Sequence, residues 1–212
     1  MSSNTNDNSE RSKKKFLALG DSYTIGESVE INERWPVRLI KQLNEKNIQI
    51  SDLKIVATTG WTTSELAAKI TEEIFEPPYD LVTLLIGVNN QYRGEDKNKY
   101  RSELTDLIYQ AIDFSGGIRS NVLVISIPDW SNTPFADNKN RAEIATEIDI
   151  YNKINLEQCD LLEVKFMDIT PISRKAKQDP TLIAEDGLHP SGKMYEQWVQ
   201  LMFPIVEKIL SD

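Results

Sequence analysis

The sequence predicts an α/β protein, specifically a three-layer α/β/α sandwich around a five-stranded parallel sheet with a flavodoxin-like strand order. Five short apolar runs alternate with longer segments of helical periodicity, which is the repeat that builds such sandwiches. Three of these runs are almost continuous in apolar residues, as expected for strands covered on both faces. Repeated right-handed crossovers between parallel strands then place helices on both sides of the sheet.

The domain organisation follows from length and composition. The chain has 212 residues, the size of one domain rather than two. Residues 1–15 are rich in Ser, Asn and Asp and end in basic residues, so we expect a disordered polar tail. Residues 16–212 then form a single domain. Its five expected strands lie at residues 16–20, 53–58, 81–87, 122–127 and 164–169.

Two helices are expected between the first three strands. Apolar residues recur at helical spacing over 35–43. Thr62 followed by Glu65 is a capping-box pattern, in which both side chains satisfy free backbone N–H groups at the start of a helix. Pro77 and Pro78 close this second helix, because proline lacks a backbone N–H and disfavours a helical residue before it.

Three longer helical patterns follow. An apolar stripe over 104–112 precedes a Gly-Gly pair, which ends that helix before the fourth strand. Residues 142–162 form the next helical pattern, and residues 194–210 form the last. The last pattern contains Pro204, where we expect a kink or a break.

Charge and composition exclude several classes of function. Lys plus Arg number 24 and Asp plus Glu 33, which gives a net charge of −9. This balance argues against a nucleic-acid partner, because neutralising phosphates requires a basic surface. No apolar run approaches the ~18 residues of a membrane-spanning helix. The single cysteine, Cys159, has no partner for a disulfide or a zinc site, and we expect it in the core.

The first fifteen residues contain no apolar segment typical of a secretion signal. We therefore expect a cytoplasmic protein from the chain as it stands. A secreted or periplasmic location would follow if a signal peptide had been removed. The sequence favours no cofactor, and the expected partner is a small-molecule substrate.

Polar residues and glycines that follow the expected strands point to a common site. In doubly wound sheets, ligands bind beyond the carboxyl ends of the strands. Ser22 follows the first strand, Gly60 the second and Asn89 the third, and a long loop after the fifth strand delivers Asp186 and His189. These five residues should therefore meet at one edge of the sheet.

Their chemistry is that of nucleophilic catalysis. The hydroxyl of Ser22 needs a base to remove its proton, and His189 is the one histidine of the chain. Asp186, three residues earlier on the same turn, can hold the imidazole in one tautomer. Attack on a carbonyl creates an oxyanion, and donors are available from the Gly60 N–H, the Asn89 amide and the Ser22 N–H.

These residues resemble the motif blocks of the SGNH, or GDSL-type, serine hydrolases. The four blocks occur in order, each after the strand expected to carry it: Gly20-Asp21-Ser22, Gly60, Gly87-x-Asn89 and Asp186-x-x-His189. The resemblance implies ester or thioester hydrolysis without a metal. It also implies Ser22 as nucleophile, His189 as base and Asp186 as its orienting group, with Ser22, Gly60 and Asn89 forming the oxyanion hole.

The chain departs from the family pattern in two places. Tyr23 stands where leucine is commonest, and Asn90 stands where the family often has aspartate. We expect activity to survive both changes, since neither residue is one of the four that name the family. Asp21 is expected to hydrogen-bond locally and shape the turn of the nucleophile, and Asp168 has no evident partner.

The sequence thus predicts a serine esterase that hydrolyses a small or medium carboxylic ester through an acyl-enzyme intermediate. The polar loop 128–138 favours an acetylated carbohydrate as substrate. Trp61, Tyr92, Trp130 and Phe135 lie on loops at the same edge, where they either line a pocket or pack the loops together.

Three alternatives stay open. The first is a lysophospholipase or thioesterase of the same family. The second is an inactive small-ligand-binding module of the same fold, against which the intact Ser, Gly, Asn and His set argues. The third is a flavodoxin-like flavin or nucleotide binder, which the loop after the first strand disfavours, because Asp21 would repel phosphate.

Overall fold

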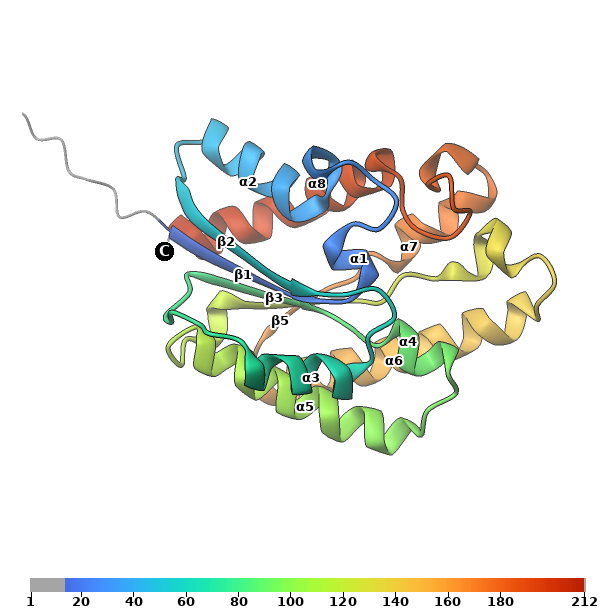
Figure 1. Ribbon diagram of the computed structural model, residues 1–212, viewed down its shortest axis with the longest axis horizontal. Coiled ribbons are helices and arrows are strands. Elements are labelled where there is room, and N and C mark those ends of the chain that lie inside the picture. The colour runs from blue at the N-terminus through green and yellow to red at the C-terminus, as the bar shows by residue number, and fades with distance from the viewer. Residues whose placement is uncertain (1–13, 212) are drawn as a thin grey trace, which may run out of the picture.

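The computed structural model describes residues 14–211 of the chain. Over these residues the sheet has five strands, all parallel, in the order β2-β1-β3-β4-β5 (Figure 1). This is the flavodoxin-like order, so the predicted fold class is confirmed. The strands are β1 (Lys14–Gly20), β2 (Ile50–Ala57), β3 (Leu81–Leu85), β4 (Val122–Ile125) and β5 (Lys165–Met167).

Helices cover both faces of the sheet (Figure 1). Helices α2 and α8 pack together on one face, and α3, α5 and α6 lie on the other. The α-helices are α1 (Ser22–Ile25), α2 (Trp35–Glu45), α3 (Thr63–Glu72), α4 (Val88–Tyr92), α5 (Lys97–Phe114), α6 (Arg141–Leu162), α7 (Thr170–Ser173) and α8 (Gly192–Ser211). Short 3₁₀ turns are η1 (Ile31–Glu33), η2 (Arg119–Asn121), η3 (Trp130–Asn132), η4 (Pro134–Ala136), η5 (Arg174–Lys177) and η6 (Pro180–Leu182).

Strand β1 begins two residues earlier than expected. The backbone N–H of Lys14 donates to the Gln49 carbonyl at 2.9 Å, and that of Lys15 donates to the Asp80 carboxylate at 2.8 Å. These bonds extend the sheet into the end of the predicted tail, which polar composition alone marked as disordered. Residues 1–13 of that tail lie outside the described residues.

The predicted start of α3 is confirmed. Of the kink or break expected at Pro204, the break does not occur. Thr62 and Glu65 form the capping box with both reciprocal hydrogen bonds. Helix α8 continues across Pro204. Both Pro204 and Gln200, whose carbonyl loses its helical partner, are exposed to solvent. Water can satisfy that carbonyl, so the proline does not end the helix.

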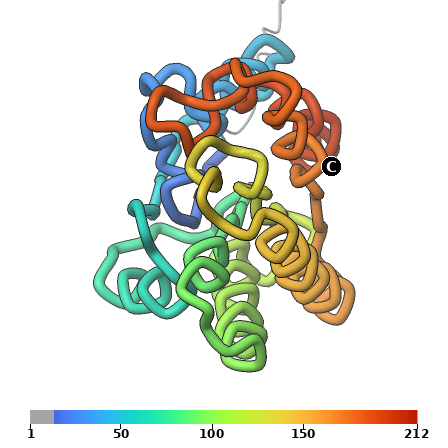
Figure 2. Tube along the Cα trace, turned by 90° about the vertical axis from the view of Figure 1, so that its right-hand side faces the viewer, coloured from blue at the N-terminus to red at the C-terminus, as the bar shows by residue number. Residues whose placement is uncertain are grey.

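The carboxyl ends of the strands meet at one edge of the molecule, which faces the viewer in Figure 2. Strands β1, β3 and β4 are buried over most of their length, so this edge is anchored in the core of the domain.

Cys159 is fully buried, as predicted. Asp168, for which no partner was expected, accepts hydrogen bonds from the Ser126 hydroxyl and the Thr170 N–H, both at 2.9 Å.

Candidate active site

Ser22, His189 and Asp186 form a continuous chain of hydrogen bonds at this edge. The Oγ of Ser22 lies 2.9 Å from Nε2 of His189, and Nδ1 of His189 lies 2.5 Å from Oδ2 of Asp186. Ser22 and His189 are separated by 167 positions in the sequence. The sheet edge therefore brings together the three side chains that the sequence predicted for one site.

The turn that carries Ser22 is fixed by its neighbours. Asp21 caps α1, and its side chain accepts from the Tyr23 N–H at 3.0 Å. Gly20 leaves no room for a side chain, because a Cβ there would lie 2.2 Å from Oγ1 of Thr24 and 2.5 Å from the Leu85 carbonyl. The backbone can thus pass from β1 directly into α1. Ser22 begins that helix, where the first N–H groups have no intrahelical acceptor.

Asp186 is held ionised by the turn that it occupies. Its Oδ1 accepts from the backbone N–H groups of Leu188 and His189, both at 2.9 Å. Burial by itself would raise the pKa of Asp186. Hydrogen bonds from His189, from the Leu188 backbone and from the Ser28 hydroxyl outweigh that effect and lower the pKa to about 2. The carboxylate can therefore only accept hydrogen bonds near neutral pH.

This carboxylate determines the tautomer of His189. Because Asp186 only accepts, Nδ1 of the imidazole carries the proton and donates it. Nε2 is left as an acceptor for the hydroxyl of Ser22, which is the orientation that a general base needs. The ring of Tyr23 packs against the imidazole, with centroids 5.2 Å apart, and helps to exclude water. His189 is only 7% exposed to solvent.

Gly60 lies in the loop after β2 and Asn89 in the short helix α4 after β3, and these two segments are bonded to each other. Asn89 donates one amide hydrogen to the Trp61 carbonyl at 2.9 Å, which leaves the second hydrogen for another acceptor. Gly60 has φ +87°, and a Cβ there would meet no atom closer than Nη2 of Arg93 at 3.9 Å. That guanidinium donates to the Gly60 carbonyl at 2.6 Å. No local sequence pattern links Arg93 to Gly60, so the sequence did not predict this contact.

Asn90, next to Asn89 in α4, is fully buried and bonds α4 to the start of α3. Its Oδ1 accepts from the Thr63 N–H at 3.1 Å, and its Nδ2 donates to the Thr63 hydroxyl at 2.7 Å. The same Nδ2 lies 3.1 Å from Oε2 of Glu95. The departure from the family pattern at this position therefore leaves a complete hydrogen-bond network, consistent with a support role for Asn90.

A small cavity of about 130 Å³ opens beside Ser22 and His189. Its other walls are mostly apolar and are formed by Tyr23, Val88, Asn89, Tyr92, Trp130, Phe135 and Leu188. The rings of Tyr92, Trp130 and Phe135 contact one another, with centroids 5.6 to 6.1 Å apart. These three aromatic residues therefore line a pocket. Trp61, the fourth aromatic candidate, packs against the core.

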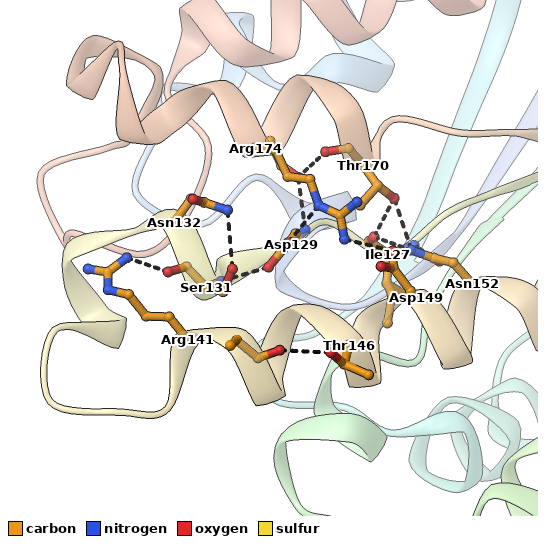
Figure 3. Close-up of polar contacts among 12 residues, drawn as sticks. Ile127, Asp129, Ser131, Asn132, Arg141, Thr146, Asp149, Asn152, Thr170 and Arg174 are labelled. Carbon is orange, nitrogen blue, oxygen red and sulfur yellow. Dashed lines mark hydrogen bonds and ion pairs between the residues drawn. The ribbon is translucent and has the colours of Figure 1, made fainter.

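Several polar groups of loop 128–138 hold the loop in place. Asp129 accepts from Nε of Arg174 at 2.7 Å and from the Ser131 N–H at 2.9 Å (Figure 3). Arg141 donates to the carbonyls of Ser131 and Thr133. These groups bind the loop to α6 and η5, while Trp130 and Phe135 reach the cavity. The polar composition of the loop therefore does not make the pocket polar.

Comparison with known proteins decides the family. The profile of the GDSL-like lipase/acylhydrolase family matches residues 18–197. The chain belongs to this family. An arylesterase from Vibrio mimicus is 26% identical over 191 residues, which cover 89% of this chain and 86% of that protein.

Solved structures of GDSL-like acylhydrolases and esterases share the fold. The psychrotrophic esterase EstA from Pseudoalteromonas matches with a TM-score of 0.71 at 16% identity, covering 94% of this chain and 100% of its own. An acetyl xylan esterase from Geobacillus stearothermophilus matches with a TM-score of 0.70 at 17% identity, covering 91% and 94%. By family, this GDSL-like protein is a carboxylic ester hydrolase.

Within residues 14–211 of this GDSL-like acylhydrolase, no helix is both long and apolar enough to cross a membrane. Over the same residues, no group of three or more His, Cys, Asp or Glu side chains is placed to hold a metal ion. Asp186, Asp21 and Arg93 each hydrogen-bond to the backbone of a turn or loop at the candidate site.

Proposed function

We propose that this GDSL-like protein is a serine esterase that hydrolyses small carboxylic esters through an acyl-enzyme intermediate. The observation that carries the proposal is the hydrogen-bonded chain from Ser22 through His189 to Asp186 at the mouth of a small apolar cavity. In this arrangement Nδ1 of His189 faces the Asp186 carboxylate and Nε2 faces the Ser22 hydroxyl, as the roles of orienting group, base and nucleophile would require.

In the first half of the reaction, Ser22 Oγ attacks the ester carbonyl while Nε2 of His189 takes its proton. The imidazolium that forms is stabilised by the ionised Asp186 at Nδ1. The C–O bond to the alcohol then breaks, and His189 returns the proton to the leaving oxygen. Water repeats the sequence on the acyl-enzyme, which releases the acid and restores Ser22.

The oxyanion of each tetrahedral intermediate would be bound by three donors: the N–H groups of Ser22 and Gly60 and the second amide hydrogen of Asn89. The Trp61 carbonyl fixes the amide of Asn89, and Arg93 fixes the Gly60 segment. Donors that are already oriented in this way need no rearrangement as negative charge develops, which is the main advantage of an oxyanion hole.

The cavity favours a short acyl chain or one flat ring as the group held beside the nucleophile. Its volume of about 130 Å³ is close to the ~150 Å³ of a cavity that holds benzene. Aromatic walls from Tyr92, Trp130 and Phe135 suit a ring that stacks edge-to-face or offset. The likeness to an arylesterase supports esters with an aromatic group as the first substrates to test.

An acetylated carbohydrate is the second candidate, since the faces of sugar rings also pack on aromatic side chains. The fold shared with an acetyl xylan esterase favours including it. Rates on phenyl acetate, an acetylated xylose and a lysophospholipid, compared by kcat/KM, distinguish the three substrate classes. A clear preference for the lysophospholipid would contradict the short-acyl proposal.

The activity itself is tested with p-nitrophenyl acetate and a serine-directed fluorophosphonate probe, using the wild type and Ser22→Ala. We expect the wild type to turn over the ester and to become labelled, and the variant to do neither. If the wild type neither hydrolyses esters nor is labelled, the protein is a binding module of the same fold and the proposal is wrong.

A further inference from the structure

The turn that follows α1 contains a serine in a left-handed backbone conformation. Ser28 has φ +62°, and among residues 14–211 only Asn47 and Glu163 share a positive φ without being glycine. This conformation is unfavourable for a residue with a Cβ. The side chain is exposed, so packing does not explain the choice of serine. The hydroxyl of Ser28 does have a specific partner.

That partner is the carboxylate of Asp186. The Ser28 hydroxyl donates to Oδ2 at 2.7 Å, and Oδ2 is the same oxygen that accepts from Nδ1 of His189 at 2.5 Å. The other oxygen, Oδ1, is already held by two backbone N–H groups. Oδ2 has no backbone donor within the described residues. Apart from Nδ1 of His189, the Ser28 hydroxyl is therefore the hydrogen-bond donor to Oδ2 among the described residues.

The same turn is bonded to a second loop of the site. The neighbouring residue, Glu27, accepts a hydrogen bond from the hydroxyl of Thr59, which precedes Gly60. Val29 on the other side packs against the core. One turn, which begins directly after the nucleophile's helix, therefore contacts both the Gly60 loop and the turn that holds Asp186 and His189.

We propose that Ser28 is a positioning residue that holds Oδ2 of Asp186 in line with Nδ1 of His189. The proposal rests on the proposed function, in which Asp186 orients the base. The side chain of Asp186 is 29% exposed, so the carboxylate would rotate and bind water more freely without a protein donor on Oδ2. Ser28 does not line the cavity, so its effect should appear in kcat and leave KM unchanged.

Two substitutions at this position separate the hydroxyl from the backbone. Ser28→Gly removes the hydroxyl and relieves the left-handed backbone, so the thermal midpoint should stay close to that of the wild type while kcat falls about tenfold, as for loss of one hydrogen bond to a charged group. Ser28→Thr keeps the hydroxyl on a β-branched side chain that disfavours this φ, so the midpoint should fall while kcat stays near the wild-type value.

Glu163→Gly is the matched control. Glu163 has φ +56° and is exposed at the end of α6, just before β5 begins, so it lies at the amino edge of the sheet, opposite the site. Glycine there relieves the same kind of backbone conformation without removing a contact to Asp186. We expect kcat and KM of this variant to equal those of the wild type.

The three variants are assayed with p-nitrophenyl acetate beside Ser22→Ala, together with their thermal midpoints. Loss of kcat in Ser28→Gly with retention in Ser28→Thr supports the proposal. Activity that follows stability across the two variants, or unchanged kcat in Ser28→Gly, overturns it. Activity retained by Ser22→Ala would instead refute the serine-esterase function, so the two failures are distinguishable.

Discussion

The amide Nδ2 of Asn90 lies 3.1 Å from Oε2 of Glu95 and donates to that carboxylate. An aspartate at the same position would place two carboxylates in contact, with one of them fully buried. The family often has aspartate at position 90. This chain instead combines asparagine at position 90 with glutamate at position 95. With this pair, Asn90 in α4 stays bonded to Thr63 and no like-charge contact arises.

We expect Asn90→Asp to destabilise the protein by about 1–3 kcal/mol at pH 8, because the buried group loses a donor and faces another carboxylate. Adding Glu95→Gln should restore most of that stability, since the amide can donate to the new carboxylate. Urea unfolding of the single and double variants measures both effects. Equal losses in Asn90→Asp with and without Glu95→Gln would contradict the explanation.

Ser22→Ala and His189→Ala should each lower kcat by about 10⁴ to 10⁶, because the hydroxyl and the imidazole act as one unit. For the same reason, the double variant should be no slower than either single variant. Steady-state rates on p-nitrophenyl acetate test this directly. Losses that multiply would show that the two residues act independently, contrary to the 2.9 Å contact between them.

Asn89→Ala should lower kcat by about 10² to 10³ while changing KM little, because the amide acts on the developing oxyanion rather than on the bound ester. The substitution also removes the bond to the Trp61 carbonyl, so its thermal midpoint is measured in parallel. If KM rises and kcat stays the same, Asn89 binds substrate instead and the assignment of this donor is wrong.

Asp21 gives the stability of the protein a defined pH dependence. Burial raises the pKa of Asp21 from 3.8 to about 7, although the Tyr23 N–H that donates to its carboxylate acts to lower it. The folded state therefore holds this proton more tightly than the unfolded state, and the group's contribution to stability declines between about pH 4 and pH 7.

Asp21→Asn stays neutral and avoids that decline. Its thermal midpoint relative to the wild type should therefore rise from pH 5 to pH 7 and become constant above pH 8. Calorimetric scans over this range measure the difference. A difference between the two proteins that does not vary with pH would show that Asp21 does not carry the raised pKa.

Phe135 forms part of the exposed wall of the cavity and should affect substrate choice rather than the chemical step. Phe135→Ala should lower kcat/KM for phenyl acetate by up to about tenfold, the worth of one aromatic contact, and leave methyl acetate almost unchanged. Tyr109→Ala, which removes a similarly exposed aromatic side chain from α5, is the control. Equal effects on both esters would exclude Phe135 from the binding of the ring.

Sequence alone determined the α/β/α fold and the set of candidate residues at one edge. Apolar runs and helical spacing are local properties, and the rule that parallel strands share a carboxyl edge turns local positions into a common site. Ser22, Gly60, Asn89, Asp186 and His189 could therefore be placed together before any contact was known. The capping box at Thr62 was equally local and was predicted correctly.

Only the tertiary structure decided which groups support that site. Ser28 and Asp186 are 158 positions apart, and Arg93 reaches Gly60 across 33 positions, so no local pattern connects either pair. The same holds for Asp129 and Ser131 in loop 128–138, whose bonds to Arg174 and Arg141 no local pattern predicts. Such contacts arise when separate loops meet at the sheet edge, because partners there are chosen by proximity in space rather than along the chain.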